Sequence, residues 1–169
     1  MTLIKAKLLA LQAHYSQIRK LSREPYIIHL FRIDEHITKL LKQSSELDKI
    51  RQIAYLHDTI EDTWITYEFL QIEFGKEIAD AVKALTKLKQ KKENELYLKQ
   101  LKNASDIVKL IKLFDIYDNI NDKFKGDKWP LFLRKIKTIT TNLELKENIY
   151  KKEFELLKKK ILENEELQI

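Results

Sequence analysis

Residues 55–63 read YLHDTIEDT, and they place one imidazole and three carboxylates within six positions. In a continuous helix, residues four apart share a face, so His57 would lie beside Glu61 and Asp58 beside Asp62. An isolated polar cluster of this kind is most often a solvated helix end. A metal-centred active site is the alternative, and the rest of the chain is needed to choose between the two.

The sequence predicts one all-α globular domain over residues 1–169. Apolar residues recur at helical spacing along nearly the whole chain, and 2 Gly and 2 Pro are too few for the turns of a strand-rich fold. The polar segment 89–103 is expected to form a loop and an exposed helix. Helices are predicted near residues 4–18, 25–43, 47–60, 76–88, 105–122, 129–142 and 145–164, with a short one after Thr66. The first helix carries an apolar stripe of Ile4, Leu8, Leu11, Tyr15 and Ile18, and the last helix is amphipathic.

Composition narrows the classes of protein to consider. Hydrophobic residues make up 44% and charged residues 34%, which is typical of a soluble globular chain. The chain has no cysteine, so disulfides and thiolate metal sites are excluded and a reducing cytoplasm is compatible. No apolar run approaches the length of a membrane span. Lys5 and Lys7 interrupt the N-terminal apolar residues, so no signal peptide is expected.

The positive charge is unevenly distributed. The net charge is +6, and residues 1–82 carry −1 while residues 83–169 carry +7. The simplest interpretation is a set of Lys-rich solvated helix faces. The alternative is attraction to a polyanion, either a nucleic acid or a phosphorylated metabolite. A basic helical binding module without catalytic activity would fit the first of these partners and would bind in a salt-sensitive manner.

Two further polar residues favour the metal site. His29 lies in the apolar run of YIIHL, and Asp115 lies among the apolar residues of LIKLFDIYDNI. A lone histidine in such a run is more often a core residue than a ligand, but a buried aspartate is costly unless it is paired or binds a metal. If the helices bring His29, His57, Asp58 and Asp115 together, two imidazoles and two carboxylates surround one cation. Without thiolates this set suits Mn, Fe, Mg or Zn, with Mn or Fe favoured.

The order His, His-Asp, Asp resembles the signature of the HD metal-dependent phosphohydrolase superfamily. The segments EPYIIH (24–29), AYLHDTIEDT (54–63), FGKEIADAVKALTKL (74–88) and VKLIKLFDIYDN (108–119) are similar to the hydrolase domain of bifunctional bacterial alarmone synthetase-hydrolases, which act on (p)ppGpp. The chain length leaves no room for a synthetase domain. The sequence therefore resembles the stand-alone small alarmone hydrolases, over about residues 15–142.

The resemblance implies roles for individual residues. Four positions match the metal ligands of the family, whose metal is typically Mn²⁺: His29, His57, Asp58 and Asp115. Glu61 and Asp62 match the pair that activates and orients the attacking water. Substrate contacts are implied for Asn119, Lys112, Arg19, Lys20, Arg23 and Arg134. The chain departs from the family at Leu30, where proline is usual, at Ile116, where a basic residue is common, and at Asp118, which replaces His or Tyr.

The function implied is a Mn²⁺-dependent 3′-pyrophosphohydrolase that converts ppGpp or pppGpp to GDP or GTP plus diphosphate. A cytoplasmic location and functional pairing with an alarmone synthetase are expected, whereas a membrane is not and a nucleic acid is a poor fit. The alternative enzyme is an HD hydrolase of another nucleotide phosphate, such as the 2′-phosphate of NADPH, or an alarmone-degrading antitoxin. The non-catalytic binding module ranks below both, since it leaves the spacing of the HD and ED pairs unexplained.

Overall fold

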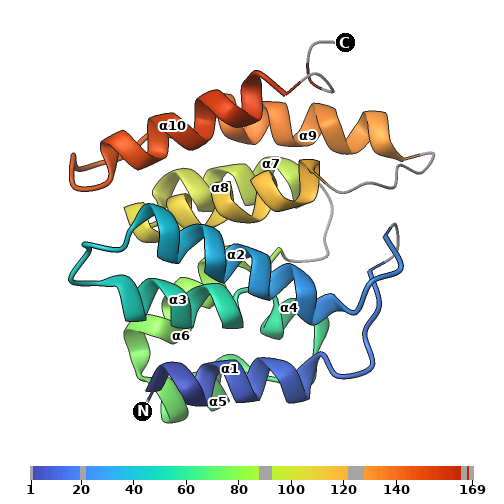
Figure 1. Ribbon diagram of the computed structural model, residues 1–169, viewed down its shortest axis with the longest axis vertical. Coiled ribbons are helices and arrows are strands. Elements are labelled where there is room, and N and C mark those ends of the chain that lie inside the picture. The colour runs from blue at the N-terminus through green and yellow to red at the C-terminus, as the bar shows by residue number, and fades with distance from the viewer. Residues whose placement is uncertain (1, 20–21, 88–92, 122–127, 165–166, 168–169) are drawn as a thin grey trace.

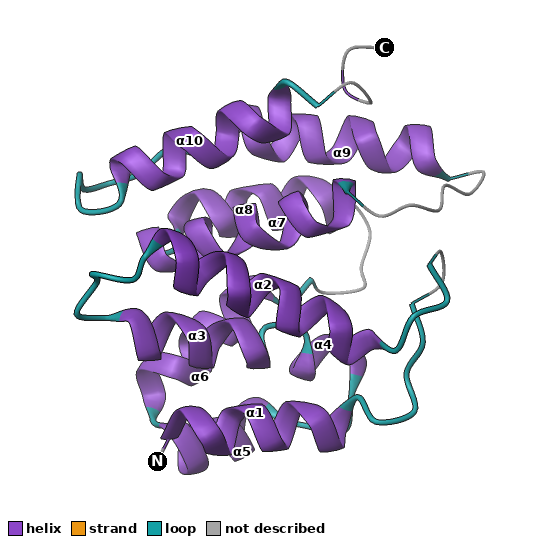
Figure 2. Cartoon of the chain, viewed as in Figure 1, coloured by secondary structure: helices purple, strands orange, loops and turns teal. Residues whose placement is uncertain are grey.

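The computed structural model describes residues 2–19, 22–87, 93–121, 128–164 and 167. These ranges form ten α-helices and no strand, which confirms the prediction of an all-α fold (Figure 2). The helices are α1 (Thr2–Ala13), α2 (Tyr26–Leu40), α3 (Leu47–Leu56), α4 (Thr59–Asp62), α5 (Tyr67–Phe74), α6 (Lys76–Leu85), α7 (Glu93–Asn103), α8 (Asp106–Ile120), α9 (Trp129–Asn142) and α10 (Lys151–Leu162).

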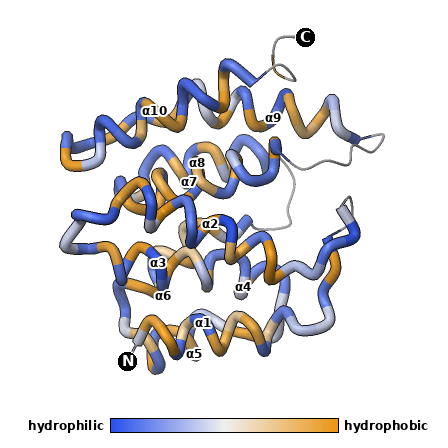
Figure 3. Tube along the Cα trace, viewed as in Figure 1, coloured by the Kyte–Doolittle hydropathy of each residue, from blue (hydrophilic) through white to orange (hydrophobic). Residues whose placement is uncertain are grey.

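The helices stack in layers (Figure 1). α1 and α5 form one outer layer and α9 and α10 the opposite one, with α2, α3, α6 and α8 between them. The contacts agree with this arrangement, because α1 packs on α3, α2 packs on both α3 and α8, and α10 packs on α8. Enclosed in this way, α8 buries most of its residues, as predicted from its apolar sequence. Figure 3 shows hydrophobic residues interspersed with hydrophilic ones along the helices, as expected of amphipathic elements around a shared core.

Local sequence explains several helix boundaries. The side chain of Thr66 caps α5 by accepting a hydrogen bond from Phe69 N, and that of Ser105 caps α8 by accepting one from Val108 N. Gly75 separates α5 from α6 with φ of +86°, a conformation that side chains disfavour. Within the described ranges, no helix has the length and hydropathy needed to cross a membrane.

The predicted apolar stripe of the first helix is wrong. α1 ends at Ala13, and Ile4, Leu8, Tyr15 and Ile18 are 66%, 60%, 90% and 60% exposed. The buried face instead carries the small residues Ala6 and Ala10, which let α1 approach α3 closely.

Two polar segments also differ from expectation. α10 begins at Lys151 rather than near residue 145. In segment 89–103, residues 89–92 lie outside the described part of the chain, and α7 is not simply exposed because Tyr97 and Leu101 are buried. Gln100 helps to fix this helix, since its side chain donates to the carbonyls of Ala84 and Thr86, each at 2.9 Å.

Candidate active site

Three polar side chains from different helices converge in the core. His29 comes from α2, His57 follows the last residue of α3, and Asp115 comes from α8; all three are buried, and one ligand atom from each lies within 4.8 Å of the others. Asp115 Oδ1 is 3.4 Å from His29 Nε2 and 3.8 Å from His57 Nε2. Asp58 joins them, with Oδ2 3.0 Å from His57 Nε2. The structure thus brings together all four residues predicted as metal ligands.

His57 and Asp58 reach this position because α3 stops. The continuous helix predicted over residues 47–60 is interrupted after Leu56, and α4 starts at Thr59. The Thr59 hydroxyl donates a hydrogen bond to the Leu56 carbonyl at 2.7 Å, which satisfies an acceptor at the end of α3. His57 and Glu61 are therefore on separate elements, not on one face of a single helix.

The geometry of His57 suits a metal ligand. Its Nδ1 is 2.8 Å from the Ala54 carbonyl, which can only accept, so Nδ1 carries the hydrogen. Its Nε2 is buried and makes no hydrogen bond with the described residues. Burial alone would lower the pKa of His57, but the carboxylates of Asp58 and Asp115 raise it to about 10. The site therefore favours a positive charge beside Nε2, and a divalent cation bound there would supply it.

Tyr26 holds the carboxylate of Asp58 in place. Its hydroxyl donates a hydrogen bond to Asp58 Oδ2, and its ring stacks on His14 with the ring centroids 4.5 Å apart. Burial, followed by the charge of Asp58, raises the pKa of Tyr26 well above its ordinary value, so the phenol remains a donor. Sequence reasoning missed this residue, although it stands beside Pro25 in one of the segments that carry the family resemblance.

Glu61 and Asp62 lie on α4, which directly follows His57 and Asp58. Glu61 Oε2 accepts a hydrogen bond from the backbone N–H of Lys87 at 2.7 Å. Burial raises the pKa of Glu61, the Lys87 N–H opposes this rise, and the charges of Asp58 and Asp62 add to it. The Asp62 side chain is exposed, while its carbonyl accepts from the side chain of Gln17 at 2.7 Å. A carboxyl whose pKa is raised towards neutrality is suited to accept a proton.

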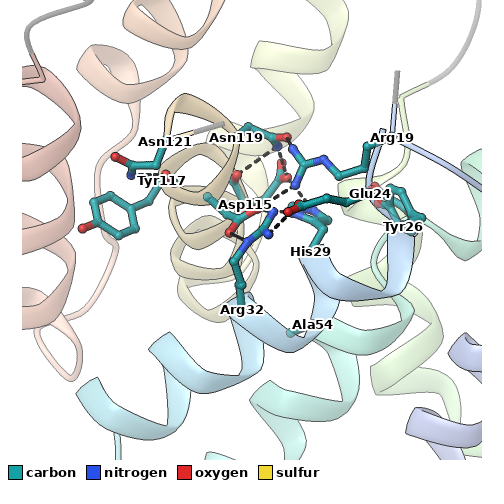
Figure 4. Close-up of polar contacts among 12 residues, drawn as sticks. Arg19, Glu24, Tyr26, His29, Arg32, Ala54, Asp115, Tyr117, Asn119 and Asn121 are labelled. Carbon is teal, nitrogen blue, oxygen red and sulfur yellow. Dashed lines mark hydrogen bonds and ion pairs between the residues drawn. The ribbon is translucent and has the colours of Figure 1, made fainter. Parts of the chain in front are cut away.

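Asn119 and Lys112 hold the carboxylate of Asp115. Asn119 Nδ2 donates to the carbonyl and to Oδ1 of Asp115, at 2.9 and 2.5 Å, and Lys112 Nζ donates to Asp115 Oδ2 at 2.6 Å. Although burial alone would lower the pKa of Lys112, the charge of Asp115 raises it above its ordinary range. Lys112 therefore carries a permanent positive charge one turn from Asp115. Figure 4 shows Asn119 and Asp115 in contact at the end of α8.

A basic cluster lies beside this aspartate. Lys112 Nζ and Lys135 Nζ lie 5.5 and 5.8 Å from the centre of the Tyr97 ring. Burial, followed by the charges of Lys112 and Lys87, lowers the pKa of Lys135 to about 8. Lys87 Nζ also donates to Glu93 Oε1 at 2.6 Å. Lys87, Lys112 and Lys135 are hereafter the lysine cluster, in which the charges of Lys87 and Lys112 act unfavourably on the charge of Lys135. An anion bound between them would relieve this repulsion.

The remaining residues predicted as substrate contacts have different positions. Arg19 reaches the site and donates to Asp118 Oδ2 at 2.8 Å and to Asn119 Oδ1 at 2.7 Å. Arg23 is exposed and adopts φ of +60° in the turn before α2, and Lys20 lies outside the described residues. Arg134 is also exposed, and it is the next residue along α9, Lys135, that reaches the site.

Comparison with known proteins agrees with this geometry. A family model described as "HD domain" matches residues 6–115, and the chain belongs to this family. The matched range includes the two histidines and both aspartates of the ligand cluster.

Curated relatives fall into two groups by length. A guanosine-3′,5′-bis(diphosphate) 3′-pyrophosphohydrolase from Aquifex aeolicus is 40% identical over 117 residues, which cover 66% of this chain and 16% of that protein. The chain likewise spans 13% of the length of a GTP pyrophosphokinase from Brucella melitensis, with 36% identity. The protein MESH1 of Xenopus tropicalis, which bears the same 3′-pyrophosphohydrolase name as the Aquifex protein, is 29% identical, and the match covers 71% of this chain and 68% of that one.

A solved structure shares the whole fold. It is described as a metazoan ortholog of SpoT that hydrolyzes ppGpp, and it superposes with a TM-score of 0.82 over 98% of this chain and 96% of its own. The sequence identity is 22%, so this likeness shows the fold alone.

Proposed function

We propose that the chain is a divalent-metal-dependent hydrolase that removes the 3′-diphosphate from ppGpp or pppGpp, giving GDP or GTP plus diphosphate. The observation that carries the proposal is the buried convergence of His29, His57 and Asp115, with His57 Nε2 buried beside the carboxylates of Asp58 and Asp115. The relatives named as ppGpp 3′-pyrophosphohydrolases support the choice of substrate.

The two histidines and two aspartates of the cluster are the proposed metal ligands. His29, His57, Asp58 and Asp115 would hold the cation, which we propose is Mn²⁺ in view of the mixed imidazole and carboxylate ligands. Such a cation lowers the pKa of its bound water and polarises a phosphoryl oxygen.

Glu61 is the proposed general base. It would take a proton from the attacking water, and the Lys87 N–H holds one of its oxygens so that the other is free to accept. Its raised pKa narrows the gap to the operating pH, which is the condition for efficient proton transfer. Asp62, its neighbour on α4, would orient the same water.

The lysine cluster would bind the diphosphate. Lys112 lies against Asp115, so a phosphate beside Lys112 also lies beside the metal-ligand group. Lysine ammonium groups act on phosphate as compact positive charges. Three such groups suit diphosphate, because this anion carries several negative charges. Arg19, which is held by its hydrogen bond to Asn119, would meet the 5′ phosphates or the base.

The proposal extends to the whole chain and its setting. We propose that residues 1–169 act as one hydrolase domain in the cytoplasm, opposing an alarmone synthetase. The basic excess of residues 83–169 would then attract a polyanionic metabolite and not a nucleic acid.

Product analysis tests the proposal directly. The purified protein is incubated with ppGpp, pppGpp, NADPH or a generic phosphodiester, in Mn²⁺ or in chelator, and the products are separated by ion-exchange chromatography. We expect Mn²⁺-dependent release of diphosphate from ppGpp and pppGpp. Release of phosphate from NADPH alone would keep the enzyme class and change the substrate. No metal-dependent release from any of the four would refute the hydrolase.

A further inference from the structure

Asp118 is a buried carboxylate that receives hydrogen bonds from three cationic or imidazole side chains. His29 Nδ1 lies 2.7 Å from its Oδ2, Arg19 Nη1 donates to Oδ2 at 2.8 Å, and Arg32 donates Nε to Oδ1 at 2.6 Å and Nη2 to Oδ2 at 3.2 Å. The side chain of Asp118 is only 3% exposed. Figure 4 shows His29, Arg19 and Arg32 gathered around this part of α8, beside Asp115.

The contact with His29 decides which ring nitrogen faces the cation. Arg19 and Arg32 can only donate, and their hydrogen bonds reach both oxygens of Asp118, so this side chain is an ionised carboxylate. An ionised carboxylate accepts and does not donate, so Nδ1 of His29 carries a hydrogen. Nε2 is left to face Asp115 Oδ1 at 3.4 Å, inside the ligand cluster. A carboxylate behind a ligating histidine fixes its tautomer and ring orientation and strengthens it as a ligand.

The two arginines keep this carboxylate from adding to the charge of the site. Asp58 and Asp115 already supply two negative charges to the cluster, and a third one nearby would compete for the cation or repel an anionic substrate. Arg32 binds Asp118 through both Nε and Nη2, in the forked arrangement that guanidinium and carboxylate favour. Arg32 also donates Nη1 to Glu24 at 2.9 Å, which holds its guanidinium in place.

We propose that Asp118 is a positioning residue that presents Nε2 of His29 to the metal and at the same time anchors Arg19 beside the substrate. The metal half of this inference stands on the ligand cluster alone, whereas the Arg19 half rests on the proposed function. Asp118 couples the two halves because a single carboxylate oxygen, Oδ2, accepts from both His29 and Arg19.

The test measures Mn²⁺ binding without substrate, by the loss of the free Mn²⁺ signal in electron paramagnetic resonance. We expect Asp118→Ala to raise the Kd for Mn²⁺ by about 10- to 100-fold, the usual effect of removing the carboxylate behind a metal-ligating histidine. Asp118→Asn keeps the volume and an oxygen that can accept from His29, so its Kd should fall between those of Asp118→Ala and the wild type. At saturating Mn²⁺, Asp118→Ala should also raise KM for ppGpp, because Arg19 loses its hydrogen bond to Asp118 and keeps the one to Asn119.

Asp34 provides a matched control. It is likewise a buried aspartate on an arginine, since it accepts from Arg51 Nε and Nη2 at 2.5 and 3.0 Å, but it touches none of the proposed ligands. Asp34→Asn should lower the melting temperature and leave the Kd for Mn²⁺ unchanged.

Several outcomes would overturn the inference. These are wild-type Mn²⁺ affinity in folded Asp118→Ala, an Asp118→Asn variant no better than Asp118→Ala, or an equal loss in Asp34→Asn. A wild-type protein that binds no Mn²⁺ would also refute it. Mn²⁺ binding that follows the expected order, in a protein that cleaves no ppGpp, would instead refute the proposed function and uphold the positioning role on the metal side.

Discussion

Lys135 should make anion binding sensitive to pH in a range where ordinary lysines remain charged. Burial and the neighbouring charges of Lys112 and Lys87 lower its pKa to about 8, against 10.5 for a free lysine side chain. The side-chain amine of Lys135 can attract diphosphate only when it is protonated and therefore positively charged. Raising the pH from 7 to 9 therefore removes this contribution, while lysines of ordinary pKa remain protonated.

The size of the effect follows from that pKa. With a pKa of about 8, roughly nine tenths of Lys135 is protonated at pH 7 and roughly one tenth at pH 9. If only the protonated form binds, the Kd for diphosphate should rise about tenfold over this range. Lys135→Arg is the matched control, because guanidinium keeps its charge throughout.

The assay is calorimetric titration of the metal-free protein with inorganic diphosphate, in chelator, at pH 7, 8 and 9. Diphosphate itself gains charge on this range, so the informative quantity is the ratio of the wild-type Kd to that of Lys135→Arg. This ratio should rise about tenfold from pH 7 to pH 9, by the protonated fractions above. A ratio that stays constant would show that Lys135 does not bind the anion in its charged form, and the proposed lysine cluster would lose its central member.

Three further outcomes can be checked on the same protein. Glu61→Gln should lower kcat for ppGpp by about 10²-fold or more, the usual scale for a general base, while equilibrium Mn²⁺ binding is retained; loss of the metal would reassign Glu61 as a ligand. Asp58→Ala should lose Mn²⁺ and activity together, and activity with bound metal would exclude Asp58 from the ligand set. Tyr55→Phe removes a hydroxyl that donates to Asp34 at 2.7 Å. The free energy of unfolding, measured in urea, should therefore fall by about 1–2 kcal/mol, while kcat stays unchanged.

The positions of residues that are costly to bury without a partner are the most predictable from the sequence. Asp115 lies among apolar residues of a buried helix, and only a hydrogen-bonding partner or a cation offsets the free-energy cost of burying its carboxylate. This conflict predicts that α8 lies in the core and that His29 and His57 lie near Asp115. The starts of α9 and α5 have local causes in the structure, namely Pro130 in the first turn of α9 and the Thr66 side chain that caps α5.

Features that depend on how two helices pack were not predictable. The larger residues of α1 suggested an apolar stripe, but the helix buries Ala6 and Ala10, and close approach to α3 outweighs the gain from burying Ile4 or Leu8. The break after Leu56 has no Gly or Pro to signal it, and His57, the first residue after the break, is buried.

The choice between neighbouring cations on α9 has the same origin. Arg134 and Lys135 are about 100° apart around the helix axis, and only the packing of α9 on the rest of the molecule decides which of them faces the site. The sequence resemblance suggested the arginine, whereas the structure turns the lysine towards Lys112 and Asp115.

The proposed ligands come from three helices that are far apart along the chain, and this gives the bound cation a thermodynamic role. An ion held by His29, His57 and Asp115 would close loops of about 28 and 58 residues, and it would bind only the folded chain in this geometry. By mass action, a ligand at one hundred times its Kd stabilises the native state by about 2.7 kcal/mol. The melting temperature should therefore rise with the concentration of free metal, and metal supply would set the lifetime of the protein as well as its rate of turnover.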